Sequence, residues 1–230
     1  MICLVMGQNA LIFSSLVGIG IASLKKQPLL SGLCFAIVSM KPHFALLLPL
    51  ALLLGRYWLA LLYTIFASLL LMLATSLAFG WDVWGVALAH FGSVSDISFS
   101  NNIILFSIYS TYRAMLTIGF APTYAWVAHF IVATLALYGL QAVWQGNYTL
   151  INKWLAFGIA ALLFSPFSFA YDAVWITLPA MVYGARVIIE NQNRTLALWC
   201  LLLLQLFAFA VISISHSLSI LIIIGARMTR

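Results

Sequence analysis

Residues 58 to 79 read WLALLYTIFASLLLMLATSLAF, a stretch of 22 residues without one charged side chain. A helix of this length reaches about 33 Å, enough to cross a hydrocarbon core of about 30 Å. The whole chain shares this character, because 6% of its 230 residues are charged and 65% are hydrophobic. An average soluble domain carries about a quarter charged residues. The sequence therefore predicts an all-α integral membrane protein and argues against a soluble enzyme.

Four apolar runs are predicted to cross the membrane completely, namely residues 10–24, 58–79, 124–144 and 195–214. Two further runs, residues 29–54 and 154–187, are longer but contain polar interruptions. The first is broken by Lys41-Pro42-His43, and the second by Ser165-Pro166 followed by Tyr171-Asp172. Each interrupted run is either one kinked span or a hairpin of two short helices.

The basic residues favour the hairpins, because Lys and Arg in short loops mark the cytoplasmic side of a membrane. With two hairpins and Ala10 on the outer side, eight basic residues fall inside: Lys25, Lys26, Arg56, Lys153, Arg186, Arg194, Arg227 and Arg230. Lys41 and Arg113 then lie on the outer side, as does Asp172. The sequence predicts one transmembrane domain over residues 1–230, a helix bundle with about eight or nine membrane-embedded helices. It also predicts an external loop at residues 80–102.

The two arms of each predicted hairpin are too short to cross the bilayer. Eleven or twelve residues reach about 16 to 18 Å as a helix, so each tip is predicted in the outer half of the membrane. Non-helical backbone at this depth is tolerated only where protein or a watery cavity surrounds it. We therefore expect the two tips to bring Lys41 and Asp172 toward one outward-facing cavity.

Three charged residues of the outer side are candidates for function. An ammonium at the centre of a span costs about 2.5 to 3.5 kcal/mol, so Lys41 either snorkels to the headgroups or binds the phosphate of a lipid-linked substrate. Asp172 either starts the returning helix or binds sugar hydroxyls, pairs with Lys41 or Arg113, or transfers a proton. Arg113 either contacts headgroups or forms a second phosphate clamp.

The remaining candidates are weaker. Gln8 and Asn9 either cap the first helix or hydrogen-bond a sugar, and His43 either fills the hairpin tip or acts as a base. No basic run suggests nucleic acid, and no histidine pair has metal-ligand spacing on one helix. The three cysteines, Cys3, Cys34 and Cys200, are isolated in or beside apolar runs, and we expect them to serve in packing.

A series of short motifs, taken in order, resembles glycosyltransferase family 87. The series comprises Gly7-Gln8-Asn9, the Lys25-Lys26 turn, Gly32, Lys41-Pro42, Leu48-Pro49-Leu50, Gly55-Arg56-Tyr57-Trp58, Phe79-Gly80-Trp81 with Trp84, the stretch SIYSTYR at residues 107–113, and Ser165-Pro166 with Tyr171-Asp172. The resemblance extends over residues 7–179.

This resemblance implies a polytopic enzyme of the C-type superfamily. Such enzymes transfer a sugar, notably mannose, from polyprenyl phosphate to an acceptor, with inversion and without a metal or other cofactor. The resemblance implies a site that faces the outer side of the bacterial inner membrane. The residues themselves offer Lys41 and Arg113 as contacts to the donor phosphate. The remaining candidates for substrate contacts are Gln8, Asn9, His43, Tyr171 and Asp172.

The catalytic carboxylate of the resembled family lies in its first external loop, and no acid of this chain matches that position. The catalytic residue is therefore unassigned. The sequence resembles the C-terminal portion of a longer enzyme, and we expect it to need an N-terminal companion segment for sugar transfer. Two other functions remain open, a transporter or flippase component with broken helices and a noncatalytic membrane subunit.

Overall fold

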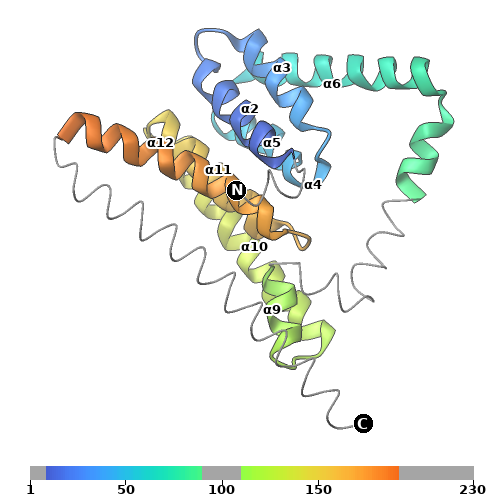
Figure 1. Ribbon diagram of the computed structural model, residues 1–230, viewed down its shortest axis with the longest axis vertical. Coiled ribbons are helices and arrows are strands. Elements are labelled where there is room, and N and C mark those ends of the chain that lie inside the picture. The colour runs from blue at the N-terminus through green and yellow to red at the C-terminus, as the bar shows by residue number, and fades with distance from the viewer. Residues whose placement is uncertain (1–8, 90–109, 192–230) are drawn as a thin grey trace.

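The computed structural model describes residues 9–89 and 110–191, and these are predominantly helical (Figure 1). The helices labelled in Figure 1 are α2 (Ala10–Ser23), α3 (Pro28–Val38), α4 (Pro42–Ala45), α5 (Leu47–Leu54), α6 (Trp58–Phe79), α9 (Thr111–Thr117), α10 (Pro122–Gln145), α11 (Leu150–Phe164) and α12 (Val174–Asn191). A short 3-10 helix, η1 (Ala170–Ala173), precedes α12. The all-α class predicted from the sequence is confirmed for this part of the chain.

Two of the described helices, α6 and α10, are long and apolar enough to cross a membrane, and they correspond to predicted spans. Helix α2 matches the predicted run at residues 10–24 to within one residue, and its complete crossing of the membrane stays a prediction. Helix α2 has 14 residues, which reach about 21 Å, because the chain turns at Leu24–Lys26. The fourth predicted span, residues 195–214, lies outside the described residues. The count of eight or nine membrane-embedded helices stays a prediction.

The chain reverses direction between α3 and α5. Pro28, the first residue of α3, lines the same pocket as Ala60, near the start of α6, so the intervening segment leaves this end of the bundle and returns to it. The reversal lies at α4, which begins at Pro42 because proline lacks the amide hydrogen that a continuous helix needs. Helix α3 then packs closely on α6, where a Cβ at Gly32 would meet the side chain of Tyr63.

The second reversal joins α11 to α12. Helix α11 begins after Thr149, whose hydroxyl accepts a hydrogen bond from the backbone N–H of Asn152 at 3.3 Å. After α11 ends, the Ser168 hydroxyl donates to the Leu162 carbonyl at 3.0 Å and holds the connection close to the helix. The two helices approach until Gly158 lies against the backbone of Trp175, where no side chain would fit. Figure 1 shows α12 running back alongside α11.

Helix α2 lies between the two hairpins and contacts α3, α11 and α12. Its Val17, which is fully buried, belongs to the same apolar cluster as Phe35 of α3, Leu48 of α5 and Phe157 of α11. The core of the described fold therefore brings together the N-terminal hairpin and the C-terminal hairpin, and it fixes their tips relative to each other.

The outer surface of the fold is apolar, most clearly on α6, which packs on α3 and extends beyond it in Figure 1. Leu62, Phe66 and Leu69 each expose about 60% of their surface. Soluble proteins rarely expose a continuous apolar face of this kind, whereas a helix in lipid requires one. The surface of α6 therefore fits a membrane protein.

The predicted external loop contains a further helical segment at residues 82–89. The indole N–H of Trp84 donates to the Ser76 hydroxyl of α6 at 2.8 Å, so this segment folds back toward the end of α6. The rest of the predicted loop, from residue 90 to residue 102, falls outside the described residues.

Candidate functional site

The two hairpin tips meet through an ion pair. The Nζ atom of Lys41 lies 3.1 Å from Oδ1 of Asp172, although 131 residues separate the two in sequence. The side chain of Lys41 is 13% exposed and that of Asp172 is 1% exposed. The sequence offered Lys41 or Arg113 as the partner of Asp172, and in the structure the partner is Lys41.

The backbone around Lys41 fixes its position at the tip. Its N–H donates to the Val38 carbonyl at 2.9 Å, which closes the end of α3. Its carbonyl accepts from Phe44 at 3.1 Å and from Ala45 at 3.0 Å, which starts α4. Lys41 thus lies between the end of α3 and the start of α4. Hydrogen bonds to both helices fix its backbone at the tip of the hairpin.

Asp172 is held on both of its carboxylate oxygens. Oδ2 accepts a hydrogen bond from the Phe169 amide at 3.0 Å, and Oδ1 accepts from Lys41. The backbone N–H of Asp172 in turn donates to the Phe169 carbonyl at 2.9 Å. Both sequence interpretations therefore apply at once, because the carboxylate organises the helical turn before α12 and pairs with Lys41.

Aromatic rings surround the Lys41 ammonium. The Nζ atom lies 5.3 Å from the ring centre of Tyr171, 5.7 Å from that of Phe44 and 6.0 Å from that of Phe13. Each such contact attracts a cation through the negative face of the ring. An ammonium carries three N–H donors, so it can donate to further acceptors while it is paired with Asp172. The arrangement holds a fixed cation in apolar surroundings.

The other predicted site residues are only partly placed. Tyr171 belongs to the site and stacks on Phe169 at 5.4 Å. Asn9 is exposed directly before α2 and makes no side-chain cap. Gln8 lies outside the described residues. His43 belongs to α4, and its side chain is also outside what the structure describes.

Arg113 lies on α9, a short helix that packs against α10. Its amide donates to the hydroxyl of Ser110, the cap of α9, at 3.2 Å. The neighbouring Tyr112 packs on Trp126 of α10 with ring centres 4.3 Å apart. The role of Arg113 as a second phosphate clamp stays a prediction.

Lys153 is a buried cation in α11, although the sequence predicts it in a basic loop on the cytoplasmic side. It is 7% exposed, and its Nζ donates to the Trp144 carbonyl at 3.2 Å and to the Tyr57 hydroxyl at 3.3 Å. The indole of Trp144 donates back to the Lys153 carbonyl at 3.1 Å. Thr149 is the residue in the sequence that could have indicated a helical position for Lys153. A helix capped at Thr149 includes Lys153 in its first turns.

Cys34 is buried in α3, as expected for a packing residue. Within the described ranges no group of three or more His, Cys, Asp or Glu side chains lies close enough to hold a metal ion. The metal-independent mechanism stays a prediction.

An apolar helical surface and a buried ion pair between two hairpins define a membrane protein with a polar centre. The model of glycosyltransferase family 87 matches residues 1–166, so the chain belongs to that family, as the sequence motifs predicted. Membership implies glycosyltransferase activity in general and a location in a membrane. The matched region includes Lys41, Arg56 and Arg113 and ends before Asp172. No curated protein and no solved structure matches the chain.

Proposed function

We propose that this chain takes part in the transfer of a hexosyl group, in the first place mannosyl, from a polyprenyl phosphate to an acceptor at the outer face of the bacterial inner membrane. The observation that carries the proposal is the Lys41–Asp172 pair between the two hairpin tips, because it places a fixed cation where apolar helices surround it. Such a cation suits a phosphate whose lipid chain lies in the bilayer.

Lys41 is the proposed phosphate contact. When the bond between the sugar and the phosphate breaks, negative charge grows on the departing lipid phosphate. A preorganised cation in a site of low dielectric constant stabilises that charge more than water does. Asp172 and the ring of Tyr171 keep the ammonium in place, and its remaining N–H groups are the proposed donors to phosphate oxygens.

Asp172 is a positioning residue in this proposal. A general base must reach the acceptor hydroxyl to accept its proton. The side chain of Asp172 is 1% exposed and its charge is paired with Lys41, so the acceptor has little access to it. We therefore place the base outside this ion pair. Arg113 as a second phosphate contact, and Gln8 and Asn9 as sugar contacts, are part of the same proposal.

Donor binding tests the proposal with the full chain in detergent and a fluorescent polyprenyl phosphate as the probe. Lys41→Met should weaken binding about ten- to a hundredfold, because it removes a charge-assisted contact. Lys26→Met removes the same charge from an exposed turn and should leave binding unchanged. The double variant Lys41→Met/Asp172→Asn removes both charges of the pair, so a loss of binding in a folded double variant separates the phosphate contact from folding.

Transfer is measured in membranes that contain this chain together with the companion segment expected from the sequence, supplied with radiolabelled polyprenyl-phosphate mannose or, in parallel, with a sugar nucleotide. We expect the lipid-linked donor alone to support transfer, and we expect Lys41→Met to reduce it. Equal donor binding by Lys41→Met and Lys26→Met would overturn the role of Lys41. Movement of the lipid-linked sugar across vesicle membranes without transfer would instead identify the chain as a carrier.

A further inference from the structure

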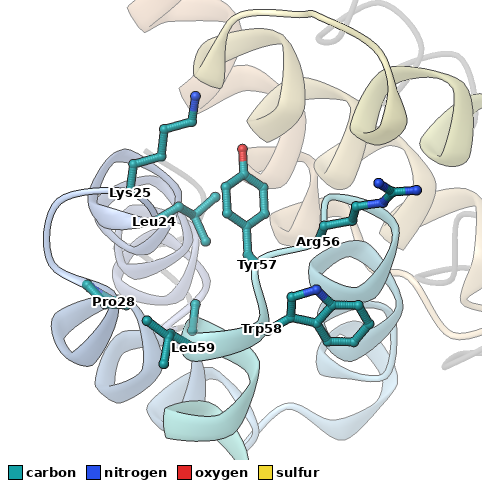
Figure 2. A pocket seen from close by; sticks show the side chains of 8 residues that line it. Leu24, Lys25, Pro28, Arg56, Tyr57, Trp58 and Leu59 are labelled. Atoms are coloured by element: carbon teal, nitrogen blue, oxygen red, sulfur yellow. The ribbon is translucent and has the colours of Figure 1, made fainter.

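A second polar site lies at the opposite end of the first hairpin from Lys41. It is a hollow of about 280 Å³ between the start of α3 and the start of α6, shown in Figure 2. Its lining residues are Leu24, Lys25, Pro28, Arg56, Tyr57, Trp58, Leu59 and Ala60. The chain between Pro28 and Arg56 runs to the Lys41 tip and back, so the two sites are separated by the length of α3.

Two helices begin at this hollow. Pro28 is the first residue of α3, and Trp58, Leu59 and Ala60 are the first three residues of α6. Neither Gln27 nor Tyr57, the residues before these helices, provides a side-chain cap, and neither first turn contains an acid. The first N–H groups of a helix have no partner within it, and together with the helix dipole they favour an anion.

Two cations line the same hollow. Lys25 and Arg56 are both exposed, and neither forms an ion pair with a carboxylate in the described part of the chain. Figure 2 shows their side chains on either side of Tyr57. The hollow is therefore positive from its side chains as well as from its helix starts.

The backbone of Arg56 is held in an unfavourable conformation at this position. Its φ is 57°, in the left-handed region that ordinarily favours glycine. The turn is closed by two hydrogen bonds, from the Arg56 amide to Leu53 at 3.0 Å and from the Tyr57 amide to Leu52 at 2.9 Å. This is the helix ending in which glycine is usual, yet the chain places arginine there. Strain of this kind concentrates at functional sites.

The hydroxyl of Tyr57 adds a donor that a buried cation polarises. Its oxygen accepts from Nζ of Lys153, which leaves the O–H free to donate. Lys153 is 7% exposed and has no carboxylate within 4 Å among the described residues. A buried charge without an opposite charge is costly, and an anion near the Tyr57 hydroxyl would offset that cost.

We propose that this hollow binds the phosphate of an anionic phospholipid at the membrane surface on this side of the bundle. Lys25, Arg56 and the Tyr57 hydroxyl contact the phosphate. Trp58 and Leu59, each about 60% exposed at the start of the candidate span α6, contact the glycerol and the acyl chains. A tryptophan at the end of a span and a basic pocket between helices are both typical of headgroup binding. The proposal uses the membrane location of the chain but not the role of Lys41.

The test measures binding of fluorescent phosphatidylglycerol to the full chain in detergent, with phosphatidylcholine as the neutral reference. Arg56→Gly removes the guanidinium and at the same time relieves the backbone, so this variant should fold at least as well as the parent protein. It should bind phosphatidylglycerol roughly tenfold more weakly. Lys26→Gln, the same change of charge one residue away from the lining Lys25, should bind normally.

Inorganic phosphate distinguishes the lipid from a soluble ligand. We expect millimolar inorganic phosphate to leave phosphatidylglycerol bound, since the acyl contacts add to the affinity. Tight binding of inorganic phosphate that Arg56→Gly abolishes would overturn the lipid assignment in favour of a soluble phosphate compound. Equal weakening by Arg56→Gly and Lys26→Gln would overturn the site itself and reduce the cations to nonspecific attraction.

Discussion

Lys41 and Asp172 form an ion pair with an N–O distance of 3.1 Å, and this pair links the turn between α3 and α4 to the helical turn before α12. The carboxylate is 1% exposed, so water does not compensate its charge. Each member of such a pair depends on the other, because one charge left alone in apolar surroundings is destabilising. The relative position of the two hairpins therefore depends on the charges of Lys41 and Asp172.

A double-mutant cycle on this pair should show strong coupling. Lys41→Met leaves the buried carboxylate without its cation, and we expect the free energy of unfolding to fall by about 3 to 5 kcal/mol. Lys41→Met/Asp172→Asn should be less destabilised than the sum of the two single variants, since neither charge remains. Denaturant unfolding of the four proteins in detergent measures this coupling. Strictly additive losses would mean that the pair does not link the hairpins.

The contact of Gly158 with Trp175 predicts a second effect on stability. A Cβ at position 158 would collide with the backbone carbonyl of Trp175, which cannot move aside as a flexible side chain would. Gly158→Ala should therefore separate α11 from α12 and lower the unfolding free energy by about 1 to 3 kcal/mol or more.

Gly139 provides the matched control for that substitution. It also lies within a long helix, α10, but a Cβ there would meet nothing within 4 Å. Gly139→Ala should leave stability unchanged or raise it by about 0.5 to 1 kcal/mol through helix propensity. Thermal unfolding measures the stability of Gly158→Ala and Gly139→Ala. Equal stability of the two variants would show that the close approach of α11 and α12 is unimportant.

The sequence predicts the polar centre well because charges are so rare in it. Lys41 and Asp172 stand out within apolar runs, and Pro42 marks the place where the helix must break. Their pairing was one of several possibilities, since Arg113 is a second cation on the predicted outer side. The tertiary packing, in which α2 contacts α3, α11 and α12 and α11 contacts α4, brings Lys41 to the distance of an ion pair.

The second site could not be predicted from sequence rules. Counting cations for topology treats Lys153 and Arg56 alike as loop residues exposed to water. Burial of Lys153 depends on Trp144 and Tyr57, which come from two other parts of the chain. The left-handed backbone of Arg56 is equally invisible, because Gly55 beside it is the residue that such a turn would be expected to use. Gly55 instead makes room for the ring of Tyr57.

Lys153 should contribute to stability through its hydrogen bonds and its position. Its ammonium donates to the carbonyl of Trp144 in the last turn of α10, where a positive charge is favourable. Lys153→Met should lower the unfolding free energy by about 1 to 3 kcal/mol, and Tyr57→Phe should lower it less because the Trp144 contact remains. Calorimetry of Lys153→Met and Tyr57→Phe in detergent compares the two losses of stability. A larger loss of stability in Tyr57→Phe would contradict this prediction.

Labelling with a thiol reagent that cannot cross membranes should place the two ends of α6 on opposite sides. The hollow puts Lys25 beside the start of α6, whereas Asp82 follows the other end of this helix, about 33 Å away at 1.5 Å per residue. In intact cells, with the three native cysteines replaced, Lys26→Cys should resist the reagent and Asp82→Cys should react, because basic loops stay inside. A permeant reagent should label both exposed positions, which controls for accessibility. Labelling of Lys26→Cys from outside would reverse the orientation and place the Lys41–Asp172 pair nearer the cytoplasmic face, which would overturn transfer at the outer face of the membrane.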